Sequence, residues 1–77
     1  MKKSKTMSNK SVLLEQVLNL LDDSQEITLI GRTGEKKTGI DTVKFIRKTE
    51  RLLLTQPVEG ISLKEGDTYL IIRLAKV

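Results

Sequence analysis

The sequence predicts an α+β domain that is mainly β, with one N-terminal helix followed by a small, strongly bent antiparallel sheet or barrel of four or five strands. Three observations support this fold class. The 77 residues are enough for one small core but not for two. The spacing of apolar residues changes from a helical to a strand period at Gln25. In the second expected strand the apolar face switches near Asp41 and Thr42, which indicates a bulge or a sharp bend.

The N-terminal part of the chain divides into a tail and a helix. Residues 1–10 contain four lysines, no acid and no periodic apolar pattern, so we expect a flexible basic tail there, with residues 11–77 forming the single domain. Ser8 or Ser11 can cap a helix of about three turns that ends before Asp22. Its apolar stripe has the i, i+3, i+4, i+7 spacing, at Leu14, Val17, Leu18 and Leu21.

The rest of the domain has strand character. Residues 27–30 predict a first strand that ends in a turn between Gly31 and Gly34, and a long second strand follows from Lys36 to a polar tip at residues 48–50. Residues 51–55 form the next expected strand, which Pro57 ends, and residues 58–63 form a short connection or strand. After a turn at residues 64–67, the terminal strand is apolar on both parities, so it is central in a sheet, closed into a barrel, or covered by the helix and a partner. The expected core is Leu14, Val17, Leu18, Leu21, Ile27, Leu29, Val43, Phe45, Leu52, Leu54, Leu70 and Ile72.

The composition argues against an enzyme. The sequence has no Cys and no His, so thiolate catalysis, Cys-based zinc sites and the commonest general base are excluded, and we expect no cofactor and no metal. Asp22, Asp23 and Glu26 lack the alternating spacing of a calcium loop. There is no apolar run of membrane-spanning length and no secretory signal after the first lysines. With no disulfides to form, a cytoplasmic location is the default expectation.

One segment resembles a phosphate-binding P-loop. Residues 31–38 follow an apolar strand and contain two glycines and a Lys-Lys-Thr sequence. A P-loop needs Gly immediately before its Lys-Thr and a helix immediately after it, whereas this chain has Lys36 there and strand-forming residues downstream. We therefore interpret the segment as a hairpin turn.

The net charge of +4 is unevenly distributed. The basic residues concentrate in the tail and between residues 32 and 51, and the remainder is neutral or acidic. This pattern is consistent with a basic β-hairpin that lies along a phosphate backbone with the tail beside it. A solvated strand face whose lysines guard an edge against aggregation explains it equally well. The candidate nucleic-acid-binding residues are Arg32, Lys36, Lys37, Lys44, Arg47, Lys48, Arg51, Lys2, Lys3 and Lys5.

The glycine pattern resembles a known family. Residues 27–34, followed by Glu35 to Gly39 with glycines at 34 and 39, resemble the first motif of the Sm/LSm-like small β-barrels, in which a helix also precedes the first strand. Residues 70–73 faintly resemble the start of the second motif. The resemblance implies an SH3/Sm-like barrel. It does not extend to uridine binding, because residues 45–48 do not match the Asp and Asn with which that family contacts RNA bases.

The leading functional hypothesis is a non-catalytic nucleic-acid-binding or regulatory module, with RNA or DNA as the partner. Phe45 and Tyr69 are the only aromatic residues, which disfavours recognition of single strands by base stacking. The alternative is a small protein-interaction or oligomerisation module that docks through an apolar strand and its polarised charge. A domain this short has a marginal core, so we expect a homo-oligomer that pairs the terminal strand or the Leu52–Leu54 strand.

Overall fold

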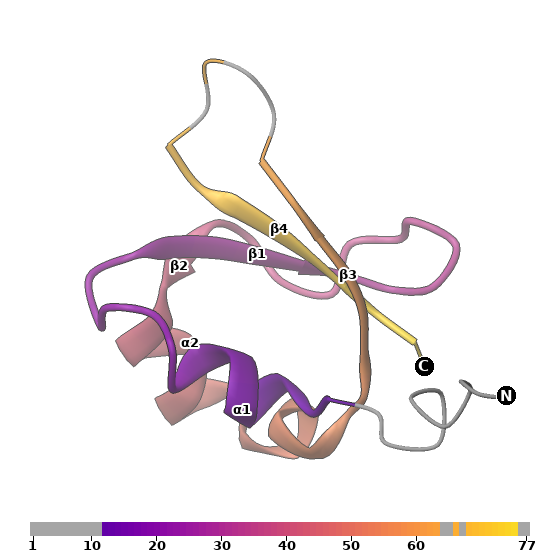
Figure 1. The fold of residues 1–77 in the computed structure, drawn as a ribbon, viewed down its shortest axis with the longest axis horizontal. Helices are drawn as coiled ribbons and strands as arrows, with labels where there is room; N and C mark the ends of the chain where they lie inside the picture. The colour runs from indigo at the N-terminus through magenta and orange to yellow at the C-terminus, as the bar shows by residue number, and fades with distance from the viewer. Residues whose placement is uncertain (1–11, 64–65, 67, 76–77) are drawn as a thin grey trace, which may run out of the picture.

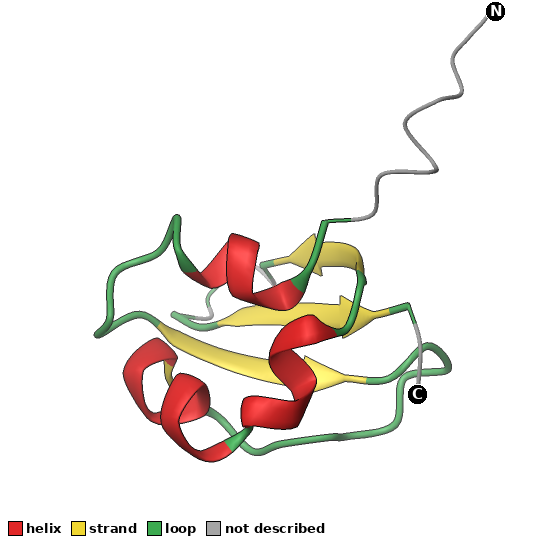
Figure 2. Cartoon of the chain, turned by 90° about the horizontal axis from the view of Figure 1, so that it is seen from below, coloured by secondary structure: helices red, strands yellow, loops and turns green. Residues whose placement is uncertain are grey.

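The computed structural model describes residues 12–63, 66 and 68–75, so the predicted tail at residues 1–10 lies outside the described residues. Its elements are α1 (Leu14–Leu18), β1 (Glu26–Ile30), β2 (Asp41–Thr42), α2 (Val43–Thr49), the 3-10 helix η2 (Arg51–Thr55), β3 (Val58–Ser62) and β4 (Leu70–Leu74). The four strands form one sheet, and the helices cover one of its faces (Figures 1 and 2). The molecule is therefore a small α+β domain with two layers. None of the helices in this part of the chain is long and apolar enough to cross a membrane.

The sheet is mixed and has the strand order β2-β1-β4-β3. At its centre β1 and β4 are parallel, with Ile27 opposite Leu70 and Leu29 opposite Ile72. The two outer strands are antiparallel to their neighbours. The expectation of an antiparallel sheet is therefore wrong. The physical reason is the helical connection between β2 and β3, which consists of α2 and η2 and carries the chain from one edge of the sheet to the other. From that edge, β4 returns to the centre and runs beside β1 in the same direction.

The prediction of a long second strand is also wrong. Of the residues expected in it, Asp41 and Thr42 form the short strand β2 beside β1, Lys36 makes an isolated bridge with Ile30, and the chain turns into α2 after Thr42. Thr42 is the N-cap of that helix, because its Oγ1 accepts a hydrogen bond from the backbone N–H of Phe45 at 3.2 Å. Val43 and Ile46, one helical turn apart, are both buried in the core. The polar segment expected as a hairpin tip is the C-terminal end of α2 and the residue after it.

The two other helical segments differ from the expectation as well. The α-helix at the N-terminus has five residues rather than about three turns, and Leu13 rather than a serine is its N-cap. Ser8 and Ser11 lie outside the described residues. Residues 51–55, expected as a strand, form η2, which packs against α1 and α2.

The core lies between the sheet and the helices. Seven residues expected there are buried, and Leu21, Leu54 and Leu70 are partly buried against them. Phe45 and Leu52 were expected in the core but are 48% and 88% exposed, because the helical backbone turns both side chains outward. Ile46 and Leu74 are buried although they were not expected there. The buried apolar residues are Leu14, Val17, Leu18, Ile27, Leu29, Val43, Ile46, Ile72 and Leu74.

Candidate nucleic-acid interface

The fold divides the basic segment from residue 32 to residue 51 into two groups. Arg32, Lys36 and Lys37 lie in the loop that follows the last residue of β1. The other cations follow β2, which pairs with the first two residues of β1. Figure 1 shows that this loop and α2 lie at opposite ends of β1. The sequence suggested a single basic hairpin, but the structure places these cations in two separate regions.

The second group forms a surface that we call the α2 basic face, made of Lys44, Arg47 and Lys48. The i, i+4 pair Lys44 and Lys48 lies on the side of α2 opposite the buried Ile46, and Arg47 lies between these lysines and the buried Val43. Lys44 and Lys48 are exposed, and within the described residues none of the three cations has an acidic partner within 4.0 Å. Within the described residues this face therefore has no ion pair of its own.

Arg47 is the most constrained member of the α2 basic face. Its Nη1 donates a hydrogen bond to Asn19 Oδ1 at 3.1 Å, and the side chain is half-buried. This contact joins α2 to the residue that ends α1. Arg51 is exposed at the start of η2, two residues beyond the end of α2. Lys2, Lys3 and Lys5 lie outside the described residues.

The loop cations are arranged around an acid. Glu35 Oε1 accepts hydrogen bonds from Thr33 Oγ1 at 2.6 Å and from the Thr33 backbone N–H at 3.2 Å. Lys37 Nζ lies 3.7 Å from Glu35 Oε2, so its charge is partly neutralised. Lys36 forms a backbone bridge with Ile30, which holds this part of the loop against the end of β1. The loop therefore offers less uncompensated charge than α2.

We expect the substitution Thr33→Val to raise the pKa of Glu35 towards its ordinary value of 4.5. Hydrogen bonds, first that from the Thr33 side chain, lower the pKa of this carboxyl, and the charge of Lys37 is a smaller cause. Because the folded pKa is depressed, Glu35 contributes to stability above its unfolded pKa, and this contribution is lost as the pH falls through the folded pKa. An NMR titration of the Glu35 side chain measures the shift. Lys37→Gln is the control and should change the pKa less; an unchanged pKa in Thr33→Val would contradict the assignment.

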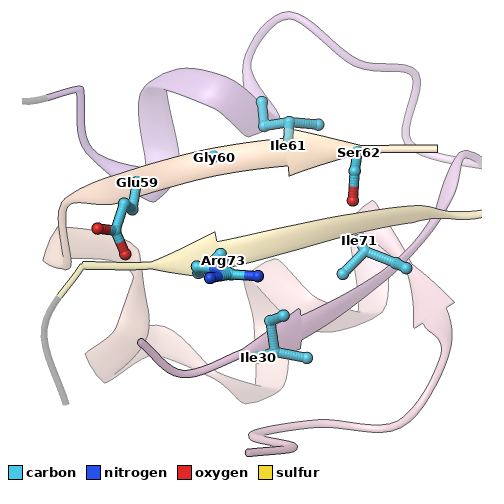
Figure 3. A pocket seen from close by; sticks show the side chains of 7 residues that line it. All are labelled: Ile30, Glu59, Gly60, Ile61, Ser62, Ile71 and Arg73. Carbon is cyan, nitrogen blue, oxygen red and sulfur yellow. The ribbon is translucent and has the colours of Figure 1, made fainter. Parts of the chain in front are cut away.

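The sheet face that no described helix covers contains two adjoining hollows. The first has a volume of about 340 Å³ and lies over β3, β4 and the end of β1, with Arg73 at its centre (Figure 3). The second, of about 350 Å³, lies beside the loop and is lined by Lys36, Ile40 and Tyr69 among others. Both share Ile30 and Ile71 as floor. Sequence reasoning did not select Arg73 or Tyr69. The signal for Arg73 was its position as the one charged residue between Tyr69 and Ala75.

The described residues contain no group of three or more acidic side chains placed to hold a metal ion. Comparison with protein-family models, with curated proteins and with solved structures gave no match. The resemblance to Sm/LSm-like barrels therefore stays a prediction. Within the described residues β2 and β3 are the two edges of the sheet, and no pairing between them closes a barrel.

Proposed function

We propose that the chain is a non-catalytic nucleic-acid-binding module that contacts the phosphate backbone through the α2 basic face. The observation that supports this function best is the clustering of Lys44, Arg47 and Lys48 on one side of α2, with no acidic partner among the described residues. Cations on one face neutralise neighbouring phosphates and release condensed counterions, and this release drives sequence-independent binding. Arg51 and the lysines at positions 2, 3 and 5 add to the positive charge of the chain.

The proposed ligand is a duplex or a structured RNA rather than an unpaired strand. Recognition of single strands relies on aromatic side chains on which bases stack. Phe45 is the one aromatic residue on α2, and Tyr69 lies on the other side of the sheet, beside the second hollow. A helix of seven residues reaches only a few phosphates, so we expect modest affinity and a salt slope of about −0.9 for each phosphate neutralised.

A double charge reversal tests the proposal. We expect Lys44→Glu with Lys48→Glu to weaken binding to a 20-base-pair duplex by about tenfold or more at low salt, and to reduce the salt slope by about 2. The matched control is Arg32→Glu with Lys36→Glu, which changes the net charge equally at the other end of β1 and should have the smaller effect. Fluorescence anisotropy at a series of salt concentrations measures both, and circular dichroism checks that each variant is folded.

Two results would overturn the proposal. An equal loss in the two double variants would mean that net charge, rather than the α2 basic face, attracts the duplex. Failure of the unaltered chain to bind either duplex DNA or structured RNA at low salt would exclude nucleic-acid binding altogether.

The alternative function, a protein-interaction module, is favoured by the open sheet face. Its two adjoining hollows have an apolar floor of Ile30 and Ile71, with the half-exposed Ile40 at the margin. The sequence had suggested the terminal strand or residues 52–54 for such contacts. Neither can pair with a partner's strand, because β4 is paired on both sides and residues 51–55 are helical. The interaction would instead use this face. Binding that is insensitive to salt would distinguish it from phosphate recognition.

A further inference from the structure

Three strands bring five residues together on the sheet face that no described helix covers. Arg73 of β4 lies between Ile30 of β1 and Gly60 of β3 in the strand register. In the next row Ile71 of β4 lies beside Ser62 of β3. Paired residues point to the same face of a sheet, and all five line the first hollow, of about 340 Å³ (Figure 3). The Arg73 side chain therefore has isoleucines near it on one side and no side chain at the paired position on the other.

Arg73 is available to a ligand in this hollow. The side chain is exposed, and among the described residues no carboxylate lies within 4.0 Å of it. A guanidinium presents planar donors that bind both oxygens of a carboxylate at once. Ile30 and Ile71 are partly exposed beside it, so an apolar group that covers them removes apolar surface from water. The hollow thus suits an acidic group with apolar neighbours.

Gly60 has no explanation in the free domain. The described glycines with positive φ are Gly34 and Gly66, so the backbone at residue 60 does not require glycine, and neither does the irregularity that precedes it. A Cβ at this position would meet no described atom within 4 Å. Glycine inside a strand weakens it and often marks a place where a ligand or another backbone approaches closely. Here the missing side chain leaves open space between the edge of the sheet and Arg73.

We propose that this hollow, the Arg73 site, binds an acidic side chain of an extended peptide segment from another protein. The carboxylate lies in the space above Gly60 and pairs with the Arg73 guanidinium, while apolar residues of the peptide cover Ile30 and Ile71. The helices lie on the opposite face of the sheet, so the Arg73 site and the α2 basic face are separate (Figure 2). The proposal specifies a partner for the protein-interaction function and does not depend on nucleic-acid binding.

Two other occupants fit the Arg73 site less well. Glu59 lines the same hollow, so a nucleic-acid backbone would bring repeated negative charges against a carboxylate and an apolar floor. A symmetric pair of chains joined at this hollow would bring two copies of Arg73 together, and like charges disfavour that arrangement. A single carboxylate on an apolar peptide avoids both costs.

Peptide selection tests the Arg73 site. With the full chain as bait, we expect a displayed library of random octapeptides to yield sequences in which Asp or Glu has apolar neighbours. Fluorescence anisotropy with one labelled peptide from this set measures the affinity, and its amide NMR shifts should concentrate at Gly60, Ile71 and Arg73. Arg73→Glu should weaken binding by about tenfold or more, and a peptide with Lys in place of the acid should prefer this variant. Lys44→Glu makes the same charge change on the opposite face and should alter the affinity by no more than about twofold.

Substitutions of Gly60 separate ligand binding from stability. Gly60→Ala and Gly60→Val should leave the free energy of unfolding unchanged or slightly higher, because the space is free and glycine weakens a strand. Both should weaken peptide binding, and the larger valine should do so more. Urea denaturation and anisotropy measure the two effects. Unchanged peptide binding in a folded Gly60→Val chain, or loss of folding in both variants, would overturn the role given to this glycine.

The remaining outcomes would overturn the Arg73 site as a whole. These are a selection that enriches no acidic peptides, or peptide binding that Arg73→Glu leaves unchanged. A duplex that shifts the same amides would assign the face to nucleic acid instead, and a concentration-dependent dimer that Arg73→Glu abolishes would assign it to a second copy. None of these results bears on the α2 basic face, which the Lys44 and Lys48 double variant tests separately.

Discussion

Ile72→Ala is expected to lower the free energy of unfolding by about 2–5 kcal/mol. Ile72 is fully buried in β4, where it lies opposite Leu29 of β1 and Ile61 of β3. Removing its outer carbons leaves a cavity between the sheet and the helices that its neighbours fill only in part. A single core in a domain of this length supplies no more than about 3–5 kcal/mol, so the substitution should remove a large share of the stability. Urea denaturation followed by circular dichroism measures the change.

Leu52→Ala is the control for this prediction. The same kind of truncation at a side chain that is 88% exposed should change the free energy of unfolding by no more than about 0.5 kcal/mol. The apolar pattern of the sequence had suggested Leu52 and Ile72 as equal members of the core. A large loss in the Leu52 variant would show that this side chain is covered, and would contradict the placement of η2.

Ile46→Asp should unfold the domain, whereas Phe45→Asp should leave it folded. Ile46 is 1% exposed and packs in the core from the inner side of α2, so a carboxylate there would be buried with no cation opposite it. Burying an unpaired charge costs several kcal/mol, which matches or exceeds the stability of a domain this small. Phe45 is 48% exposed, so the same substitution there removes only partial burial. Thermal unfolding of both variants, monitored by circular dichroism, gives the comparison.

The two aspartate variants also distinguish the strand that the sequence predicted for residues 43–49 from the helix that the structure contains. In a strand, Val43 and Phe45 share the inner face and Ile46 points away from it, so Phe45→Asp would be the damaging change. In the helix the inner pair is Val43 and Ile46. A reversal of the expected order, with Ile46→Asp stable and Phe45→Asp unfolded, would therefore contradict α2 and restore the strand.

The elements with a clear apolar period were predictable from the sequence. The alternation at Ile27 and Leu29 and the apolar terminal strand form strands close to where they were expected, whereas the apolar stripe at Leu14, Val17 and Leu18 forms a helix of five residues in place of the expected three turns. The turns at the two glycines with positive φ, Gly34 and Gly66, were also recognisable, since glycine adopts that conformation without steric cost. These features depend on residues near one another in sequence.

The segment from Gly39 to Thr55 was not predictable in the same way. Over so few residues, Val43 with Phe45 fits a strand and Val43 with Ile46 fits a helix, and periodicity alone does not decide between them. The deciding feature is Thr42, whose side chain caps α2. The bulge or sharp bend expected near Asp41 and Thr42 is the point at which β2 passes into α2, and the irregularity in the sheet lies between Val58 and Gly60.

The candidate site was predictable in its residues but not in its grouping. The sequence selected Lys44, Arg47 and Lys48, and the structure brings these three together. In the strand expected there, Lys44 and Lys48 would share one face and Arg47 would share the other with Lys37, because a strand alternates sides at every residue. The helix unites all three and leaves Lys37 in a distant loop beside Glu35. Which cations act together thus depended on the one element that the apolar pattern left ambiguous.

The parallel pairing of β1 with β4 constrains the order of events in folding. The first long strand acquires its central neighbour only when residues near the other end of the domain arrive, and Gln25 and Thr68, whose contact adjoins this pair, are 43 residues apart. During synthesis on the ribosome, β4 emerges well after the first helices and strands. Until then, α1 and α2 have no complete sheet to pack against. We therefore expect the nascent domain to stay unfolded until Leu74 has emerged, and to fold more slowly than a helical bundle of equal length.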